Sequence, residues 1–333
     1  MNARTDATYL NLIASLTALS RVALSRYGLP GASTIALLSH SENTVFRIVH
    51  AHTGQQFAMR IHRPNYQTRH AIQSELDWME ALNASGINTP HVVPGVDGDR
   101  LQEVESQSIG TRLVALFEWV DGVFPDEREL APSMRRLGAL SARMHHHSRQ
   151  WLRPSYFERQ TWDSTDTIGE GARWGRWRDM PDLSVDRIAV LAETERLLHR
   201  RLDVFGRSPD RFGLIHADLR IANLLVDGER TTIIDFDDCG IGWFLHDMAS
   251  AMSFIEHRTD LPQLMDAWAE GYVEHGSLSS AELEEFPTFV MQRRLQLLAW
   301  MASHSETDLA RSFGSGWVAA TADLGKAYLQ TMG

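Results

Sequence analysis

Hydrophobic and polar positions follow two different periods along the chain. Over the first 120 residues, short alternating runs are separated by turn residues, whereas from about residue 128 apolar residues recur at helical spacing. The stripe formed by Met134, Leu137, Leu140 and Met144 is typical of this second pattern. The alternating runs predict strands at 34–39, 44–50, 55–61, 101–105 and 111–119. Later helices are predicted near 184–205, 243–256, 261–275, 280–304 and 307–330.

Two helices are predicted within the first third. A leading amphipathic helix covers about residues 6–27, because Leu12, Leu16 and Leu19 share one face and Gly28 stops the pattern. A second helix runs from about Thr68 to residue 83, with Thr68 as its N-cap. The change of period at residues 119–122 predicts a small sheet domain over 1–120 and a larger, mostly helical domain over 121–333, hence an α+β protein.

Composition narrows the function classes. A single cysteine, Cys239, excludes a disulfide framework and any multi-cysteine metal site, and suits a reducing cytoplasm. No segment approaches the ~20 apolar residues of a membrane span. The net charge of −11 argues against broad nucleic-acid binding. Most of this charge falls in residues 121–333, where it could attract a cationic ligand or could simply form a solvated acidic surface.

The stretch 212–249 carries the chemistry. A short apolar strand ends at His216, Asp218 follows in a loop, and Asn223 comes five residues later. Two β-like runs joined by the turn at 227–228 place Asn223 and Asp235 at one end of a hairpin, beside Asp218. Such oxygen ligands together suit Mg²⁺ and phosphate chemistry. The alternative is that these are ordinary polar residues at strand ends. That alternative would explain any one of them, but it explains the whole set poorly.

The ordered motif resembles the aminoglycoside phosphotransferase, choline kinase and homoserine kinase superfamily, which has the protein-kinase-like fold. The matching elements are His216-x-Asp218-x-x-x-x-Asn223, Ile234-Asp235-Phe236 and Asp247-Met248-Ala249. The resemblance implies two lobes: a nucleotide-binding lobe with one main helix over 1–120, and a helical catalytic lobe over 121–333. It also implies that Asp218 is the catalytic base or orienter, and that Asn223 and Asp235 hold Mg²⁺ on the ATP phosphates. His216 and Asp247 are expected to brace the loop, with Leu225 and Ile234 beneath the adenine.

The first lobe should supply the rest of the nucleotide site, with one departure from the family. Kinase-like folds place a small residue and a lysine on the cleft face of the strand at 55–61, where this chain has Ala58 and Arg60. The only lysine is Lys326, so Arg60 is expected to take the lysine's place. Glu75 falls on the apolar face of the following helix, and a carboxylate there needs a partner, for which Arg60 is the candidate. The alternative is a surface arginine and a half-exposed glutamate.

Two weaker signals complete the expected nucleotide site. Residues 39–44 lie where protein kinases carry a glycine-rich loop, but they contain no glycine. Backbone N–H groups near Ser41 and Asn43 are still expected to meet phosphate. The run at 116–122 resembles the family hinge, in which backbone groups of Glu118 and Val120 would bond to adenine, although it also reads as a plain strand end.

Two aromatic or basic clusters have competing interpretations. The segment 151–182 holds four tryptophans, which either line a ligand site or plug a long loop onto the helical domain. The three consecutive histidines at 145–147 point about 100° apart on a helix and therefore cannot easily chelate one ion.

The sequence thus predicts a cytoplasmic, ATP- and Mg²⁺-dependent phosphotransferase with an alcohol group as acceptor. The acceptor is expected to be a small molecule such as an aminoglycoside, an amino alcohol or a homoserine-like compound, without nucleic-acid or membrane partners; the oligomeric state stays open. One alternative is a bacterial stress-response type Ser/Thr protein kinase. The other is a non-catalytic nucleotide-binding scaffold, suggested by Arg60 and the missing glycines but disfavoured by the retention of Asp218, Asn223 and Asp235.

Overall fold

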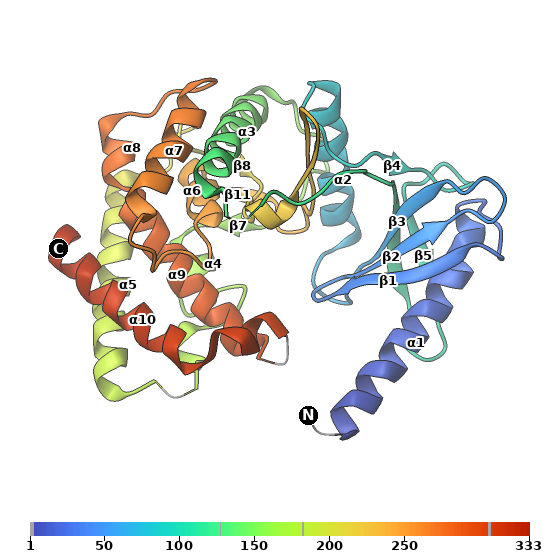
Figure 1. The fold of residues 1–333 in the computed structure, drawn as a ribbon, viewed down its shortest axis with the longest axis horizontal. Coiled ribbons are helices and arrows are strands. Elements are labelled where there is room, and N and C mark those ends of the chain that lie inside the picture. The colour runs from blue at the N-terminus through green and yellow to red at the C-terminus, as the bar shows by residue number, and fades with distance from the viewer. Residues whose placement is uncertain (1–2, 127, 182, 306–307) are drawn as a thin grey trace. The chain divides into compact units, whose positions relative to one another are not determined.

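The computed structural model describes residues 3–126, 128–181, 183–305 and 308–333, which form two compact units (Figure 1). The first unit comprises Met1–Gly122, Arg153–Glu158 and Asp227–Ile234. The second comprises Val123–Leu152, Arg159–Val226 and Asp235–Gly333. A small antiparallel-sheet unit and a mostly helical unit confirm the predicted α+β class. That the first unit binds the nucleotide and the second carries the catalytic residues stays a prediction.

The first unit is an antiparallel sheet with two helices. Its strands are β1 (Thr34–His40), β2 (Thr44–Val49), β3 (Gln56–Ile61), β4 (Val92–Val93), β5 (Leu101–Val104) and β6 (Arg112–Glu118). They pair in the order β1-β2-β3-β6-β4, and β5 pairs with β6. The helices are α1 (Ala3–Arg26) and α2 (Arg69–Ala84). All five strands expected from the alternating pattern are therefore present, together with the short β4, which the pattern did not indicate.

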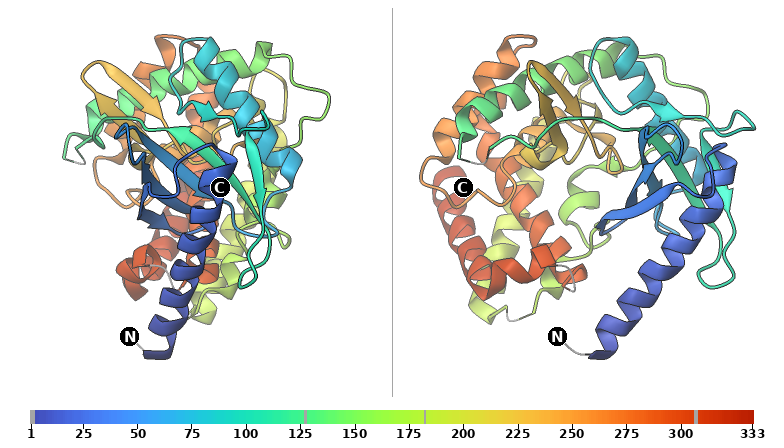
Figure 2. Two further views of the ribbon diagram at one scale, coloured as in Figure 1. Left: turned by 90° about the vertical axis from the view of Figure 1, so that its right-hand side faces the viewer. Right: turned by 45° about the vertical axis from the view of Figure 1, so that its right-hand side comes forward.

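Helix α1 packs on this sheet because its apolar stripe meets the inward side chains of the strands (Figures 1 and 2). Leu16 and Leu19 lie in one buried cluster with Phe46, Met59 and Val114. The alternation expected for β3 is confirmed, since its odd-numbered apolar positions all enter this cluster. The side chains at the beginning of α1, up to residue 7, lie outside the described residues.

Helix α2 begins at its predicted cap. The Thr68 hydroxyl accepts a hydrogen bond from the backbone N–H of Ala71 at 3.0 Å, which satisfies one of the free donors of the first turn. The buried face of α2 carries Ile72, Leu76 and Met79, and Glu75 lies among them. A fully buried carboxylate is thereby placed within the first unit.

The remaining elements belong to the second unit, except for β10 (Arg230–Ile233), which belongs to the first. The helices are α3 (Leu130–Gln150), α4 (Ser164–Ile168), η1 (Trp177–Asp179), α5 (Val185–Phe205), η2 (Ile221–Asn223), α6 (Phe244–Ala251), α7 (Leu261–Val273), α8 (Ser280–Glu284), α9 (Phe286–Ser303) and α10 (Asp308–Met332). A small sheet has the order β7-β11-β8, formed by Thr161–Trp162, Gly240–Trp243 and Phe212–Ile215. The strands β9 (Leu224–Asp227) and β10 (Arg230–Ile233) form the expected hairpin.

Two predicted helices are shorter than expected. The segment 280–304 is divided into α8 and α9, because Pro287 lies at the start of α9 and cannot continue a preceding helix. The helix predicted over 243–256 ends at Ala251, and the chain turns through the following residues, with Phe254 at a left-handed φ of 71°. In both segments, apolar residues keep helical spacing beyond the point where the helix ends, so the spacing alone predicted too long a helix.

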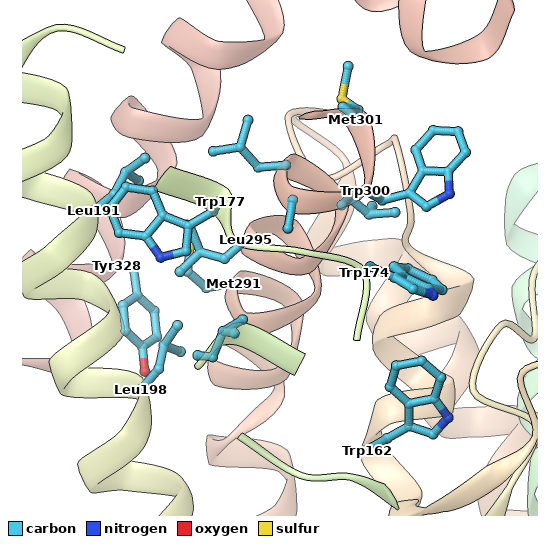
Figure 3. Packing of buried hydrophobic residues seen from close by; sticks show 14 of the residues in the cluster. Trp162, Trp174, Trp177, Leu191, Leu198, Met291, Leu295, Trp300, Met301 and Tyr328 are labelled. Atoms are coloured by element: carbon cyan, nitrogen blue, oxygen red, sulfur yellow. The ribbon is translucent and has the colours of Figure 1, made fainter. Parts of the chain in front are cut away.

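The tryptophan-rich segment is part of the core of the second unit. Trp162, Trp174 and Trp177 are buried in a cluster with residues of α5, α9 and α10, such as Leu191, Leu295 and Tyr328 (Figure 3). The indole rings of Trp162 and Trp174 meet edge to face, with 5.6 Å between their centroids. These three side chains therefore anchor the loop to the helices by packing into the core. This is the second of the two interpretations of the segment, in which the tryptophans hold the loop rather than line a ligand site.

Helix α9 runs through the middle of the second unit. Nearly every residue from Phe286 to Met301 is buried, including Arg293 and Arg294. A helix buried on all sides has no solvent-facing stripe on which to place a charge, so both arginines need partners inside the protein.

Helices α3 and α7 approach each other closely through two glycines. A methyl group added at Gly138 would lie 1.9 Å from the backbone oxygen of Trp268, and one at Gly271 would lie 1.8 Å from that of Arg135. This contact fixes α3, and with it His145, against the rest of the unit. Among the described residues, no helix is long and apolar enough to cross a bilayer.

Candidate active site

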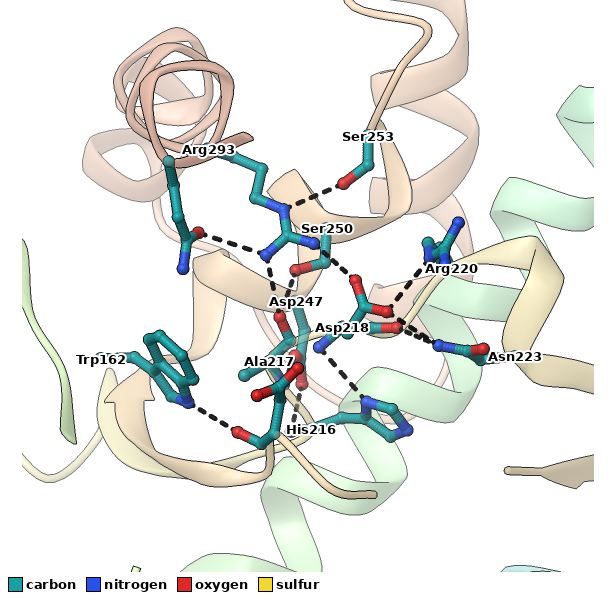
Figure 4. Close-up of polar contacts among 12 residues, drawn as sticks. Trp162, His216, Ala217, Asp218, Arg220, Asn223, Asp247, Ser250, Ser253 and Arg293 are labelled. Carbon is teal, nitrogen blue, oxygen red and sulfur yellow. Dashed lines mark hydrogen bonds and ion pairs between the residues drawn. The ribbon is translucent and has the colours of Figure 1, made fainter. Parts of the chain in front are cut away.

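The loop after β8 carries the His-x-Asp motif in a strained conformation. Ala217, between His216 and Asp218, has a left-handed φ of 69°, which is unfavourable for a residue with a β-carbon. Its backbone N–H donates to Asp247 Oδ1 at 2.7 Å, and its carbonyl accepts from the Ser250 hydroxyl at 2.9 Å (Figure 4). These bonds from α6 hold the loop in a shape that it would not adopt alone.

Asp218 is engaged on both carboxylate oxygens. Oδ1 accepts from Nη2 of Arg293 at 2.5 Å. Oδ2 accepts from Nε of Arg220 at 3.1 Å and from Nδ2 of Asn223 at 3.0 Å (Figure 4). The three partners come from α9, the loop itself and η2, so the carboxylate is fixed from several directions.

The charge state of Asp218 follows from these neighbours. Burial by itself would raise the pKa of this carboxyl, but the guanidinium groups of Arg220 and Arg293 oppose that effect and hold the pKa below its ordinary value. Asp218 is therefore ionised at neutral pH. A carboxylate of such low basicity is better suited to orient a hydroxyl group than to remove its proton early.

Asp247 braces the loop from below, as the sequence led us to expect. Its side chain accepts from the backbone N–H groups of His216 (3.1 Å) and Ala217, and from Nε2 of His145 at 3.0 Å. Burial alone would raise the pKa of Asp247, and the hydrogen bond from His145 is the first of the contacts that lower it. His216 helps in a second way, because its ring Nδ1 accepts from the backbone N–H of Asp218 at 3.3 Å.

The histidine run on α3 has a structural use. His145 is fully buried, which lowers the pKa of its ring, so the ring is neutral. With Nε2 donating to Asp247, Nδ1 is left to accept from the hydroxyl of Tyr272 at 3.1 Å. Both ring nitrogens of His145 are thus engaged in hydrogen bonds inside the second unit.

The donor set after the loop fits a hard divalent cation. Since Nδ2 of Asn223 donates to Asp218, its amide oxygen faces away from that carboxylate and is the atom that could bind a metal (Figure 4). Asp235 follows β10, is exposed, and has a left-handed φ of 67°, a form of strain common at functional sites. Among the described residues there is no group of three or more His, Cys, Asp or Glu side chains arranged to hold an ion. Mg²⁺ bound by one or two protein oxygens ordinarily completes its coordination with phosphate and water.

A comparison with known families decides what this constellation belongs to. Residues 34–286 match the phosphotransferase enzyme family. The chain belongs to this family. The match includes the loop with Asp218, the hairpin that follows it, and β3 and α2 of the first unit.

Individual relatives of this phosphotransferase are kinases of small molecules. The solved structure of a microcompartment-associated aminopropanol kinase is 39% identical, with a TM-score of 0.87 over 95% of this chain and 98% of that chain. Amicoumacin kinase of Bacillus subtilis (strain 168) is 25% identical over 82% of this chain and 81% of its own length. The structure of an amicoumacin kinase in complex with AMP-PNP, Ca²⁺ and Ami has a TM-score of 0.73 at 23% identity, over 98% of this chain and 95% of that chain, and shares the fold.

These findings establish the fold and the class of reaction. The phosphotransferase has the protein-kinase-like fold of its structural neighbours, and it is a small-molecule kinase that acts on a hydroxyl group. The predicted family membership and enzyme class are confirmed, and the small-molecule reading is favoured over the protein-kinase and scaffold alternatives.

In the first unit of the phosphotransferase, the expected ion pair is present. Nη2 of Arg60 lies 2.6 Å from Oε1 of Glu75, and both side chains are buried. The guanidinium also lies over the ring of Phe117, with its central carbon 5.1 Å from the ring centroid. The alternative of a surface arginine is thereby wrong. Contact between Arg60 and phosphate stays a prediction.

The other nucleotide residues expected from sequence stay predictions too. In the β1–β2 turn, the Ser41 N–H donates to the carbonyl of Asn43 at 3.1 Å, and Asn43 Oδ1 accepts from the backbone N–H of Arg63 at 3.1 Å. The Ser41 amide would have to leave this bond to meet phosphate. The remaining predicted positions, none of them fully buried, are Ala58, Glu118, Val120, Leu225 and Ile234.

Sequence reasoning missed Arg293 and His145 as parts of this site. Arg293 is 75 positions from Asp218 along the chain, and His145 is 102 from Asp247, so no local spacing connects them. A usable signal was present for the arginine, because two adjacent cations in a helix with no other charged residue must be partnered inside the protein.

Proposed function

We propose that this protein transfers the γ-phosphoryl group of ATP to the hydroxyl group of a small amino alcohol, with Mg²⁺ as the metal. The observation that carries the proposal is the 39% identity to the aminopropanol kinase, which extends over 95% of this chain and 98% of that one. The net charge of −11 supports an acceptor that carries an amine, because an acidic protein attracts cations.

Each residue of the loop has a part in this reaction. Asp218 accepts a hydrogen bond from the acceptor hydroxyl, orients its oxygen toward the γ-phosphorus, and takes up the proton as the new P–O bond forms and the bond to ADP breaks. Asn223 and Asp235 would hold Mg²⁺, which neutralises phosphate charge when bound. The capture of AMP-PNP and Ca²⁺ by the amicoumacin kinase of the same fold supports use of a nucleotide and a divalent metal.

The first unit would bind the nucleotide. Arg60, oriented by Glu75, would meet the phosphates in place of the family lysine, next to Ala58. Glu118 and Val120 would bond to the adenine edge, Leu225 and Ile234 would contact its face, and the turn at Ser41 and Asn43 would close over the phosphates.

The test is a panel of acceptors offered with ATP and Mg²⁺, with ADP formation as the readout. The panel contains aminopropanol, ethanolamine, homoserine, an aminoglycoside and a serine peptide, and the rate without acceptor is subtracted. We expect the largest kcat/KM with an amino alcohol. A larger kcat/KM with the aminoglycoside or the peptide would contradict the proposed acceptor class.

A further inference from the structure

Arg293 has more contacts with the catalytic loop than a structural ion pair requires. The side chain is 1% exposed, and its guanidinium reaches acceptors from three parts of the second unit (Figure 4). Nη2 donates to Asp218 Oδ1 at 2.5 Å, and Nη1 donates to the carbonyl of Ala217 at 3.3 Å and to Oε1 of Gln296 at 3.2 Å. Nε donates to the Ser253 hydroxyl at 3.0 Å. All three guanidinium nitrogens are thus in use.

The orientation of this group is fixed by packing as well. The guanidinium carbon of Arg293 lies 4.9 Å from the ring centroid of Trp174, which belongs to the buried tryptophan cluster. A planar fork held between four acceptors and an indole ring has little freedom to turn. Arg293 can therefore transmit the rigidity of α9 to Asp218 and to the strained Ala217.

The next residue of the helix provides a comparison within the same protein. Arg294 is also buried and pairs with Glu256 at 2.7 Å, while its other nitrogens donate to Thr321 and to the carbonyl of Trp317. None of these partners belongs to the loop around Asp218. Both arginines contribute to the interior of the unit, but only Arg293 reaches the site.

The hydrogen bonds of Asp218 indicate what this contact does. A carboxylate has about four acceptor positions. Among the described residues, Arg220 and Asn223 occupy those of Oδ2, and Arg293 occupies one of Oδ1. The position that is left on Oδ1 is next to the Arg293 contact, so the arginine determines the direction in which this lone pair points.

We propose that Arg293 is a positioning residue for phosphoryl transfer, which sets the rotation of the Asp218 carboxylate so that one Oδ1 lone pair faces the acceptor hydroxyl. This inference rests on the proposed role of Asp218. The reaction would then require a residue outside the His-x-Asp motif. That residue lies on α9, which begins some 60 residues after the motif.

A double-mutant cycle tests the inference. Arg293→Lys retains the charge but loses the fork, and we expect kcat to fall about 10²-fold, the usual cost of a misplaced catalytic group, with the KM for ATP unchanged. In an Asp218→Asn background the same substitution should change kcat by less than about twofold, because the group it positions is already lost. A purely structural role would lower kcat by the same factor in both backgrounds and would overturn the inference.

Two further variants distinguish a loss of positioning from a loss of folding. Arg294→Lys is the matched control: it should lower the melting temperature but leave kcat within about twofold, and an equal fall in kcat would overturn the inference. If Arg293→Lys does not fold, Ser253→Ala removes only the acceptor of Nε; kcat should still fall in the wild-type background and not with Asp218→Asn. Near-wild-type turnover by Asp218→Asn alone would instead show that the proposed function has assigned Asp218 wrongly.

Discussion

Asp218 is the residue on which the chemistry depends. Replacing it with asparagine preserves the shape and removes the charge that orients the acceptor hydroxyl. We expect kcat to fall by about 10²–10⁴-fold, the range of a general-base contribution, with little change in ATP affinity. Steady-state kinetics measure kcat, and calorimetric titration with AMP-PNP measures nucleotide affinity. Full activity of Asp218→Asn would remove this residue from the mechanism.

The proposed metal ligand Asp235 gives a separate prediction. Asp235→Ala removes the one carboxylate proposed to hold Mg²⁺, so turnover at ordinary Mg²⁺ concentrations should be abolished. The dependence of ATP affinity on Mg²⁺ should also weaken. Asp227→Ala, at the exposed end of β9, is the control and should titrate as the wild type does. Identical Mg²⁺ titrations of Asp235→Ala and wild type would show that Asp235 is not the ligand.

The Arg60–Glu75 pair predicts effects on both stability and nucleotide binding. Arg60→Ala takes the guanidinium away from a fully buried carboxylate and should cost about 3–5 kcal/mol of unfolding free energy, as well as raise the KM for ATP. Arg60→Lys should not restore the KM, because a point charge does not reproduce a planar fork. Urea denaturation and initial rates check these outcomes. Arg136→Lys on the exposed face of α3 is the control. Better turnover with Arg60→Lys would mean that the arginine is a tolerated replacement.

The residues of the motif could be predicted because they are close in sequence. His216, Asp218 and Asn223 lie within eight positions of one loop, and the turn at 227–228 brings Asp235 back to the same hairpin end. The pairing of Arg60 with Glu75 was also accessible, since strand alternation and helix periodicity each point one side chain inward. Arg293 and His145 could not be located in this way, because tertiary packing alone brings them to the site.

At the scale of elements, the close contact of α3 and α7 depends on glycine. Gly138→Ala would place a methyl group against the backbone of α7, which cannot yield as a flexible side chain would, and should cost about 1–3 kcal/mol. Gly316→Ala on α10 meets nothing within 4 Å and should be neutral or stabilise by up to about 1 kcal/mol. Urea denaturation distinguishes them. A stabilised Gly138→Ala variant would refute the close approach.

Helices and strands could be predicted where the apolar periodicity and the residues that begin or end an element agreed. Helix α2 has a clear stripe and a threonine cap, and its observed bounds are within one residue of the expected ones. Strands β4, β7 and β11 are two to four residues long, too short for a period to appear. The prediction for α6 was too long because Met252, Phe254 and Ile255 continue the apolar spacing through the turn that follows Ala251.

At the scale of the whole molecule, the chain combines a sheet unit that holds a buried arginine with a helical unit that holds an ionised, oriented aspartate. Family membership makes these the two parts of a small-molecule kinase. The presence of Arg60 where a lysine was expected does not imply loss of catalysis. The pair with Glu75 is formed, and the residues proposed for transfer, Asp218, Asn223 and Asp235, are all present.

The most direct test of this account follows the phosphoryl group itself. The protein is incubated with γ-labelled ATP, Mg²⁺ and aminopropanol, and the products are separated for wild type and Asp218→Asn. The account predicts that the wild type places label in the phosphate ester of the amino alcohol and that Asp218→Asn does so at a rate about 10²–10⁴-fold lower. Label found only in inorganic phosphate, or on a protein, would contradict it.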